Sequence, residues 1–104
     1  MRKFLCFTAA AALGATGAMA AATDHLDGAK FLPLTKVSLA QARATALAAR
    51  PGGQITDQEL EKERGGTGLR YSFDIKANGK TFEVGVDGRT GKVLENKAEG
   101  PNPD

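Results

Sequence analysis

Residues 69–93, LRYSFDIKANGKTFEVGVDGRTGKV, constrain the fold more than any other part of the chain. Apolar and polar side chains alternate on both sides of Asn78-Gly79, a dipeptide that tolerates the positive φ angles of a type I′ turn. We therefore predict a β-hairpin about this turn. Its apolar pairs all fall on one face, as a correct register requires: Ile75 with Phe82, Phe73 with Val84, and Tyr71 with Val86.

The preceding segment, Ile55–Arg64, reads as a charged strand, ITDQELEKER, followed by the glycine-rich loop 65–68. Pairing across this loop places core-facing Leu60 opposite Phe73. Ile55 has the opposite parity, so it reaches the core only through a bulge near Asp57-Gln58 or from the connecting loop. The same pairing also gives two further partners: Arg64 with Leu69, and Lys62 with Tyr71.

A helix is expected from Ser38 onward. Ser38-Leu39-Ala40-Gln41 has the form of a capping box, in which the serine and glutamine side chains satisfy unpaired backbone N–H groups. Pro51-Gly52-Gly53 then ends the helix. One apolar stripe runs along it: Leu39, Ala42, Ala46 and Leu47.

After the hairpin, residues 87–92 (DGRTGK) read as a turn, in which the Asp87 carboxylate accepts from following amides, with Thr90 and Gly91 completing it. Val93 and Leu94 begin a short fourth strand. The expected fold is α+β: one helix packed on the apolar face of a four-stranded antiparallel β-meander.

The N-terminus has the features of an export signal. Residues 1–20 combine a short positive start with an apolar run too short to span a bilayer comfortably, and Ala18-Met19-Ala20 suits cleavage after Ala20, with cleavage after Ala22 as the alternative. A retained N-terminal anchor is the other interpretation. We expect a periplasmic or secreted protein with a flexible leader at 21–36, one domain at 37–96 and a disordered tail at 97–104.

Charge and cysteine content exclude several functions. From residue 21 onward the chain has twelve Lys/Arg and twelve Asp/Glu, so it lacks the basic excess of a nucleic-acid-binding protein. Its single cysteine, Cys6, lies in the expected signal, which leaves no disulfide and no thiolate metal site. Cys6 also lacks the preceding small residues of a lipoprotein signal.

No catalytic, cofactor or metal site is expected. The single histidine, His25, lies in the leader, and Ser38 and Ser72 have no histidine base nearby in a folded segment. Residues 24–27 (DHLD) would hold a metal weakly, so ordinary polar leader is the preferred interpretation. The turn at Asp87 lacks the repeated ligands and closing glutamate of a calcium loop, which favours a structural role.

The whole arrangement resembles the PepSY domain over about residues 37–94. The resemblance rests on the helix start LAQA at 39–42, on the helix end PGG at 51–53, and on the strand segments ELEKE at 59–63, YSFDI at 71–75 and FEVGVD at 82–87 with TGKV at 90–93. This family is known from propeptides of thermolysin-like metallopeptidases, from a spore-germination membrane protein and from small exported proteins. Its usual pattern has a larger residue at Gly85, so packing or outer-face chemistry is expected to differ there.

The resemblance implies a non-catalytic protein-binding module that inhibits or modulates a peptidase of the cell envelope. Because no catalytic domain follows in this sequence, we expect no role as a propeptide in cis. The alternative is a general periplasmic interaction or structural domain, monomeric or weakly associating and without stable membrane insertion. As the partner-binding region we expect the exposed edge of the first strand, where unpaired backbone groups allow strand addition and the carboxylates select a basic partner: Glu59, Glu61 and Glu63. A solvated edge that resists aggregation is the simpler interpretation of the same charges.

Overall fold

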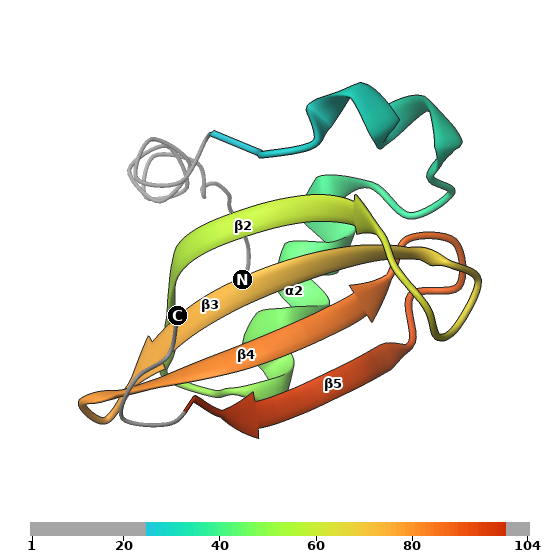
Figure 1. Ribbon diagram of the computed structural model, residues 1–104. Helices are drawn as coiled ribbons and strands as arrows, with labels where there is room; N and C mark the ends of the chain where they lie inside the picture. Colours follow the sequence, from blue (N-terminus) through green and yellow to red (C-terminus); the bar gives the residue numbers. More distant parts are fainter. Residues whose placement is uncertain (1–24, 100–104) are drawn as a thin grey trace, which may run out of the picture.

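The computed structural model describes residues 25–99 (Figure 1). The 3₁₀ helix η1 (Ala29–Leu34) and the α-helix α2 (Leu39–Ala49) precede four strands, β2 (Gln54–Lys62), β3 (Leu69–Ala77), β4 (Lys80–Asp87) and β5 (Val93–Ala98). The strands form one antiparallel sheet in the order β2-β3-β4-β5, and α2 covers one of its faces. The predicted α+β fold is confirmed. The expected signal peptide, residues 1–20, lies outside the described residues.

The central hairpin has the predicted register. Tyr71 pairs with Val86, Phe73 with Val84 and Ile75 with Phe82. Asn78 and Gly79 have φ angles of 55° and 76°, as the type I′ turn requires.

The register of β2 against β3 differs by two residues from the prediction. Leu60 lies opposite Tyr71 rather than Phe73, and Lys62 opposite Leu69 rather than Tyr71. The loop is longer than expected because β2 ends at Lys62 and the Glu63 N–H donates to the Gly68 carbonyl at 3.1 Å. A shift of two residues keeps every side chain on its predicted face. The predicted irregularity is present between Ile55 and Asp57, and it brings Ile55 into the core.

Helix α2 begins as predicted. Ser38 Oγ accepts from the Gln41 N–H at 3.1 Å, while Gln41 Oε1 accepts from the Ser38 N–H at 2.9 Å, which completes the capping box. Ala42 and Ala46 are fully buried against the sheet. Their small side chains let the helix lie close to the strands, where Tyr71 and Phe73 are also fully buried.

The described part of the expected leader, residues 25–36, lies against the edge of the sheet and contains η1. It begins with an extended stretch in which Leu26 is buried and Asp27 forms a parallel bridge with Glu59 of β2. The Leu60 N–H donates to the Asp27 carbonyl at 2.7 Å. The sequence showed no periodicity here because buried Leu26, partly buried Phe31 and hydrogen bonds to β2 hold the segment in place, and these contacts do not require an alternating pattern.

Strand β5 also runs beyond the expected start of the tail at residue 97. Lys97 and Ala98 pair with Glu83 and Phe82, and the Glu99 N–H donates to the Thr81 carbonyl at 2.9 Å. Most β5 side chains are exposed, so backbone pairing extends the strand without an alternating apolar pattern in the sequence.

Candidate functional site

The sheet face opposite α2 is open and acidic. Residues 25–99 contain ten Asp and Glu residues, and strand alternation and side-chain contacts place eight of them on this open face. The other two are Asp27 and Asp87. The open face also carries three cations, Arg70, Lys76 and Lys97. Its carboxylates are Asp57, Glu59, Glu61, Glu63, Asp74, Glu83, Glu95 and Glu99.

Three of these carboxylates form a row across three neighbouring strands. Asp57 of β2 lies directly opposite Asp74 of β3, and Asp74 lies directly opposite Glu83 of β4. Like charges in directly opposed positions destabilise a sheet. We call Asp57, Asp74 and Glu83 the acidic row.

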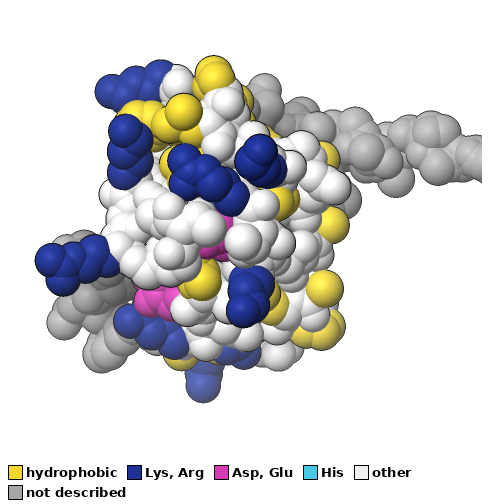
Figure 2. Space-filling model, turned by 90° about the vertical axis from the view of Figure 1, so that its right-hand side faces the viewer, with side chains coloured by type: hydrophobic (Ala, Val, Ile, Leu, Met, Phe, Trp, Pro, Cys, Tyr) yellow, Lys and Arg dark blue, Asp and Glu magenta, His cyan; other side chains and the backbone are white. Residues whose placement is uncertain are grey.

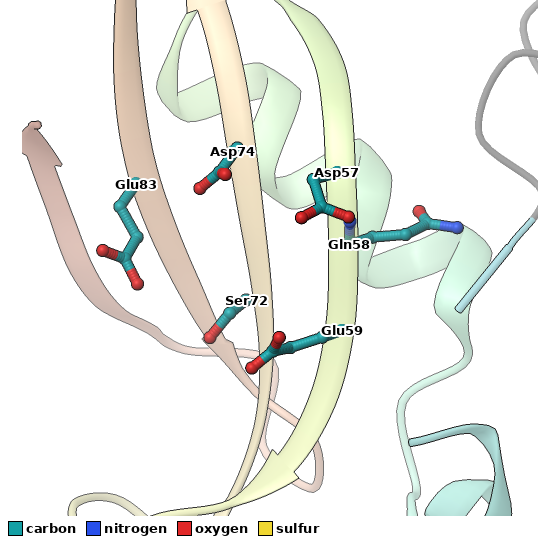
Figure 3. Close-up of a pocket in the computed structure, with 6 residues that line it drawn as sticks. All are labelled: Asp57, Gln58, Glu59, Ser72, Asp74 and Glu83. Carbon is teal, nitrogen blue, oxygen red and sulfur yellow. The ribbon is translucent and has the colours of Figure 1, made fainter. Parts of the chain in front are cut away.

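The acidic row borders a shallow hollow of about 80 Å³ that Glu59 and Ser72 also line (Figure 3). Gln58 points to the other side of β2, where its amide donates to the His25 carbonyl at 2.9 Å and its Oε1 accepts from Arg43 at 2.6 Å. The hollow therefore presents carboxylate and hydroxyl oxygens.

Burial and mutual repulsion raise the pKa values of two carboxyl groups on this face, Asp74 and Glu83. Burial raises the pKa of Asp74 to about 6, and the neighbouring Glu99 and Asp57 carboxylates contribute to the rise. Burial likewise raises the pKa of Glu83, with further contributions from Glu95 and Asp74. A carboxylate with a raised pKa gains from a nearby cation, because the cation favours its charged form.

Arg70 neutralises another part of the open face. Its guanidinium lies 3.2 Å from Glu95 and 4.0 Å from Glu63, and it donates to the Arg64 carbonyl at 3.1 Å. A Cβ on Gly85 would lie 3.0 Å from Arg70 Cδ. The small residue at position 85 therefore gives Arg70 room to lie across the sheet.

The structure changes the interpretation of the expected partner-binding edge. The side chains of Glu59, Glu61 and Glu63 belong to the open face, where Glu61 accepts from the Ser72 hydroxyl at 2.8 Å. The backbone edge of β2 is partly covered, because Asp27 is hydrogen-bonded to it next to Glu59. Strand addition at the centre of β2 would have to displace this segment.

Asp87 has a structural environment. Its carboxylate accepts from the Thr67 N–H at 2.7 Å, the Thr67 hydroxyl at 2.8 Å, the Arg89 N–H at 2.8 Å and the Thr90 N–H at 3.0 Å. Burial by itself would raise the pKa of Asp87, but these hydrogen bonds lower it well below the usual range. Gly91 completes the turn at a φ of 80°. The sequence did not identify Thr67, although the glycines around it indicate a tight loop.

The segment around His25 and Asp27, which the sequence offered as a weak metal site, gains no further metal ligands from the described residues. His25 Nε2 contacts Asp27 at 2.7 Å on an exposed surface, and residues 25–99 contain no group of three side chains arranged to hold a metal. Within the same range, no helix is long and apolar enough to cross a membrane.

Comparison with known proteins identifies the family. The family model described as "Peptidase propeptide and YPEB domain", PepSY, matches residues 36–97 of the chain. No curated protein and no solved structure gives a significant match. The chain belongs to the PepSY family, which is associated with peptidase propeptides and regulation. PepSY domains are generally non-catalytic and typically extracellular or periplasmic.

Proposed function

We propose that this protein is an exported, non-catalytic module that binds a basic surface of another envelope protein through its open face. The concentration of eight of ten described carboxylates on this face carries the proposal. A partner cation placed near the acidic row would relieve the repulsion between Asp57, Asp74 and Glu83.

The open face suits this role better than the edge of β2. An added strand would compete with Asp27 for the backbone groups of Gln58 and Leu60. A partner resting on the open face leaves all of these hydrogen bonds in place. The partner-selecting role of Glu59, Glu61 and Glu63 is retained, with contact through side chains instead of backbone pairing.

The partner that we propose is an exported peptidase, whose activity this module inhibits or modulates. The family's association with peptidase propeptides and regulation supports this choice. The alternative is a periplasmic interaction domain that acts on no peptidase, and the same open face would serve it equally well.

Affinity capture from an envelope extract tests the proposal. The variant Asp57→Asn/Asp74→Asn/Glu83→Gln removes three negative charges from the acidic row. A matched control, Ala40→Lys/Ala44→Lys/Ala48→Lys, changes the net charge equally on exposed positions of α2. We expect the parent and the control to capture the same partner and the acidic-row variant to lose it.

A second measurement separates the two partner classes. Casein hydrolysis by the captured fraction is followed with and without added parent protein. Peptidase activity that decreases or changes on addition supports a peptidase partner. A captured protein without peptidase activity favours the general interaction domain, and equal capture by all three proteins contradicts the open-face proposal.

A further inference from the structure

One end of the molecule is a second charged surface, built by three segments that are distant in sequence. They are the β2–β3 loop at 63–68, the β4–β5 turn at 88–92, and the segment that contains η1 and leads into α2. The Lys36 and Val37 N–H groups both donate to the Gly88 carbonyl, at 2.9 and 3.0 Å. Asp87 joins the loop to the turn through Thr67 and Thr90. We call this region the basic end, and these bonds hold its segments in fixed positions.

Cations dominate the basic end. Figure 2 views it directly and shows dark-blue Lys and Arg side chains spread over it, with few acidic ones. Asp87 is 1% exposed and hydrogen-bonded, and Glu63 lies on the Arg70 side of the loop. Six cations belong to these segments and the adjoining end of β2: Lys30, Lys36, Lys62, Arg64, Arg89 and Lys92.

Exposed aliphatic side chains lie among these cations. Within residues 25–99, the large hydrophobic residues with the greatest exposure are Leu32, Leu34 and Val93, at 36%, 42% and 44%. Two of them belong to η1, and Val93 directly follows the β4–β5 turn. Hydrophobic side chains accordingly appear beside the Lys and Arg side chains in Figure 2.

We propose that the basic end docks on an anionic lipid bilayer. Leucine and valine side chains gain from entering the boundary between headgroups and acyl chains, while neighbouring lysines and arginines extend toward lipid phosphates. An acidic protein partner would pair with the cations, but acidity alone would not explain why aliphatic side chains are exposed to water beside them. The open face and this end are different sides of the molecule, so the open face stays accessible when the end is docked (Figure 1). This inference does not rest on the proposed partner of the open face.

Vesicle co-sedimentation tests the proposal with the full chain. The probes are phosphatidylcholine vesicles with and without phosphatidylglycerol, at low and high salt. Arg64→Gln/Lys92→Gln removes two cations from the basic end, and Lys76→Gln/Lys80→Gln removes two near the β3–β4 turn at the opposite end. Leu34→Ser tests the aliphatic contribution. All variants share residues 1–24, so differences between them arise from the substituted positions, and circular dichroism checks their folding.

We expect the parent to prefer phosphatidylglycerol vesicles and to bind less at high salt. The Arg64/Lys92 variant should lose about tenfold or more in partitioning, and the Lys76/Lys80 variant much less. Leu34→Ser should weaken binding at both salt concentrations. Equal losses for the two charge variants would show a net-charge effect and overturn the proposal. Unchanged binding by Leu34→Ser would overturn it too, because the end would then recognise anionic charge without a lipid boundary.

Discussion

At the scale of single residues, Asp87 shows how much one carboxylate can organise. It satisfies donors from Thr67, Arg89 and Thr90, and it thereby joins two loops that are 20 residues apart. The sequence indicated its role in its own turn because Asp followed by Gly, Thr and Gly is typical turn chemistry. Thr67 could not be predicted, since only the completed sheet brings the β2–β3 loop beside this turn.

Asp87→Ala should lower the free energy of unfolding by about 2 kcal/mol at neutral pH, because it leaves several buried donors unsatisfied. The lowered pKa of Asp87 means that the native state favours the charged form, so its contribution is present at neutral pH and is lost as the pH falls below about 4. Urea unfolding of parent and variant at several pH values measures this. Calcium should not change the parent's melting temperature; a calcium-dependent rise absent from the variant would indicate a metal loop instead.

Asp74 should have the opposite pH dependence. Its pKa is raised to about 6, so the native state binds more protons than the unfolded chain between about pH 4 and pH 6, and stability falls as the pH rises through that range. Asp74→Asn should therefore stabilise the protein by about 1 kcal/mol at pH 7.5, after allowance for solvent screening at this partly exposed site. At pH 4 the gain should disappear. Denaturant midpoints at the two pH values provide the measurement, and an equal gain at both would exclude a titration effect.

At the scale of elements, local signals determined how well each segment could be predicted. The β3–β4 hairpin was predicted with its register, because alternation and Asn78-Gly79 agree on one pairing. The β2–β3 loop contains three glycines with positive φ angles, at positions 65, 66 and 68, and such a loop does not specify its own length. The register of β2 was therefore displaced by two residues, although its buried face was correctly predicted.

The docking of the segment at Asp27 depends on Gly28. Gly28 has a φ of 83°, and a Cβ there would overlap the Leu60 carbonyl. Gly28→Ala should cost about 2 kcal/mol or more and expose the edge of β2. Gly52→Ala is the matched control, because Gly52 has a φ of 81° but no atom within 4 Å of an added Cβ.

Hydrogen exchange at the Leu60 amide distinguishes these two variants, since this N–H donates to the Asp27 carbonyl. We expect markedly faster exchange at Leu60 in Gly28→Ala, with little change in Gly52→Ala beyond that caused by its lower global stability. Equal protection of Leu60 in both would mean that the segment does not depend on Gly28 for its position.

At the scale of the whole molecule, the fold separates charges that balance in the sequence. The chain from residue 21 onward has equal numbers of acidic and basic residues, yet most described carboxylates face one side of the sheet and six cations gather at one end. Alternation predicted that Glu59, Glu61 and Glu63 point away from the core. The predicted hairpin register already pairs Asp74 with Glu83 on the open face. The third member of the acidic row could not be predicted, because the sequence-based register placed Asp57 opposite Lys76 instead of Asp74.

The most direct test of the open-face proposal is amide chemical-shift mapping during titration with a synthetic peptide of alternating lysine and threonine. In an extended peptide, alternate residues lie on one side about 7 Å apart, a spacing that matches alternate carboxylates along a strand. A peptide of alternating glutamate and threonine is the control. We predict salt-sensitive chemical-shift changes centred on four residues of the open face: Asp57, Ser72, Asp74 and Glu83. The variant Glu59→Lys/Glu61→Lys/Glu63→Lys should lose these changes. Its circular dichroism spectrum should remain native. Shifts centred on α2 or the outer edge of β5, or undiminished shifts in the folded variant, would contradict the proposal that the open face binds basic partners.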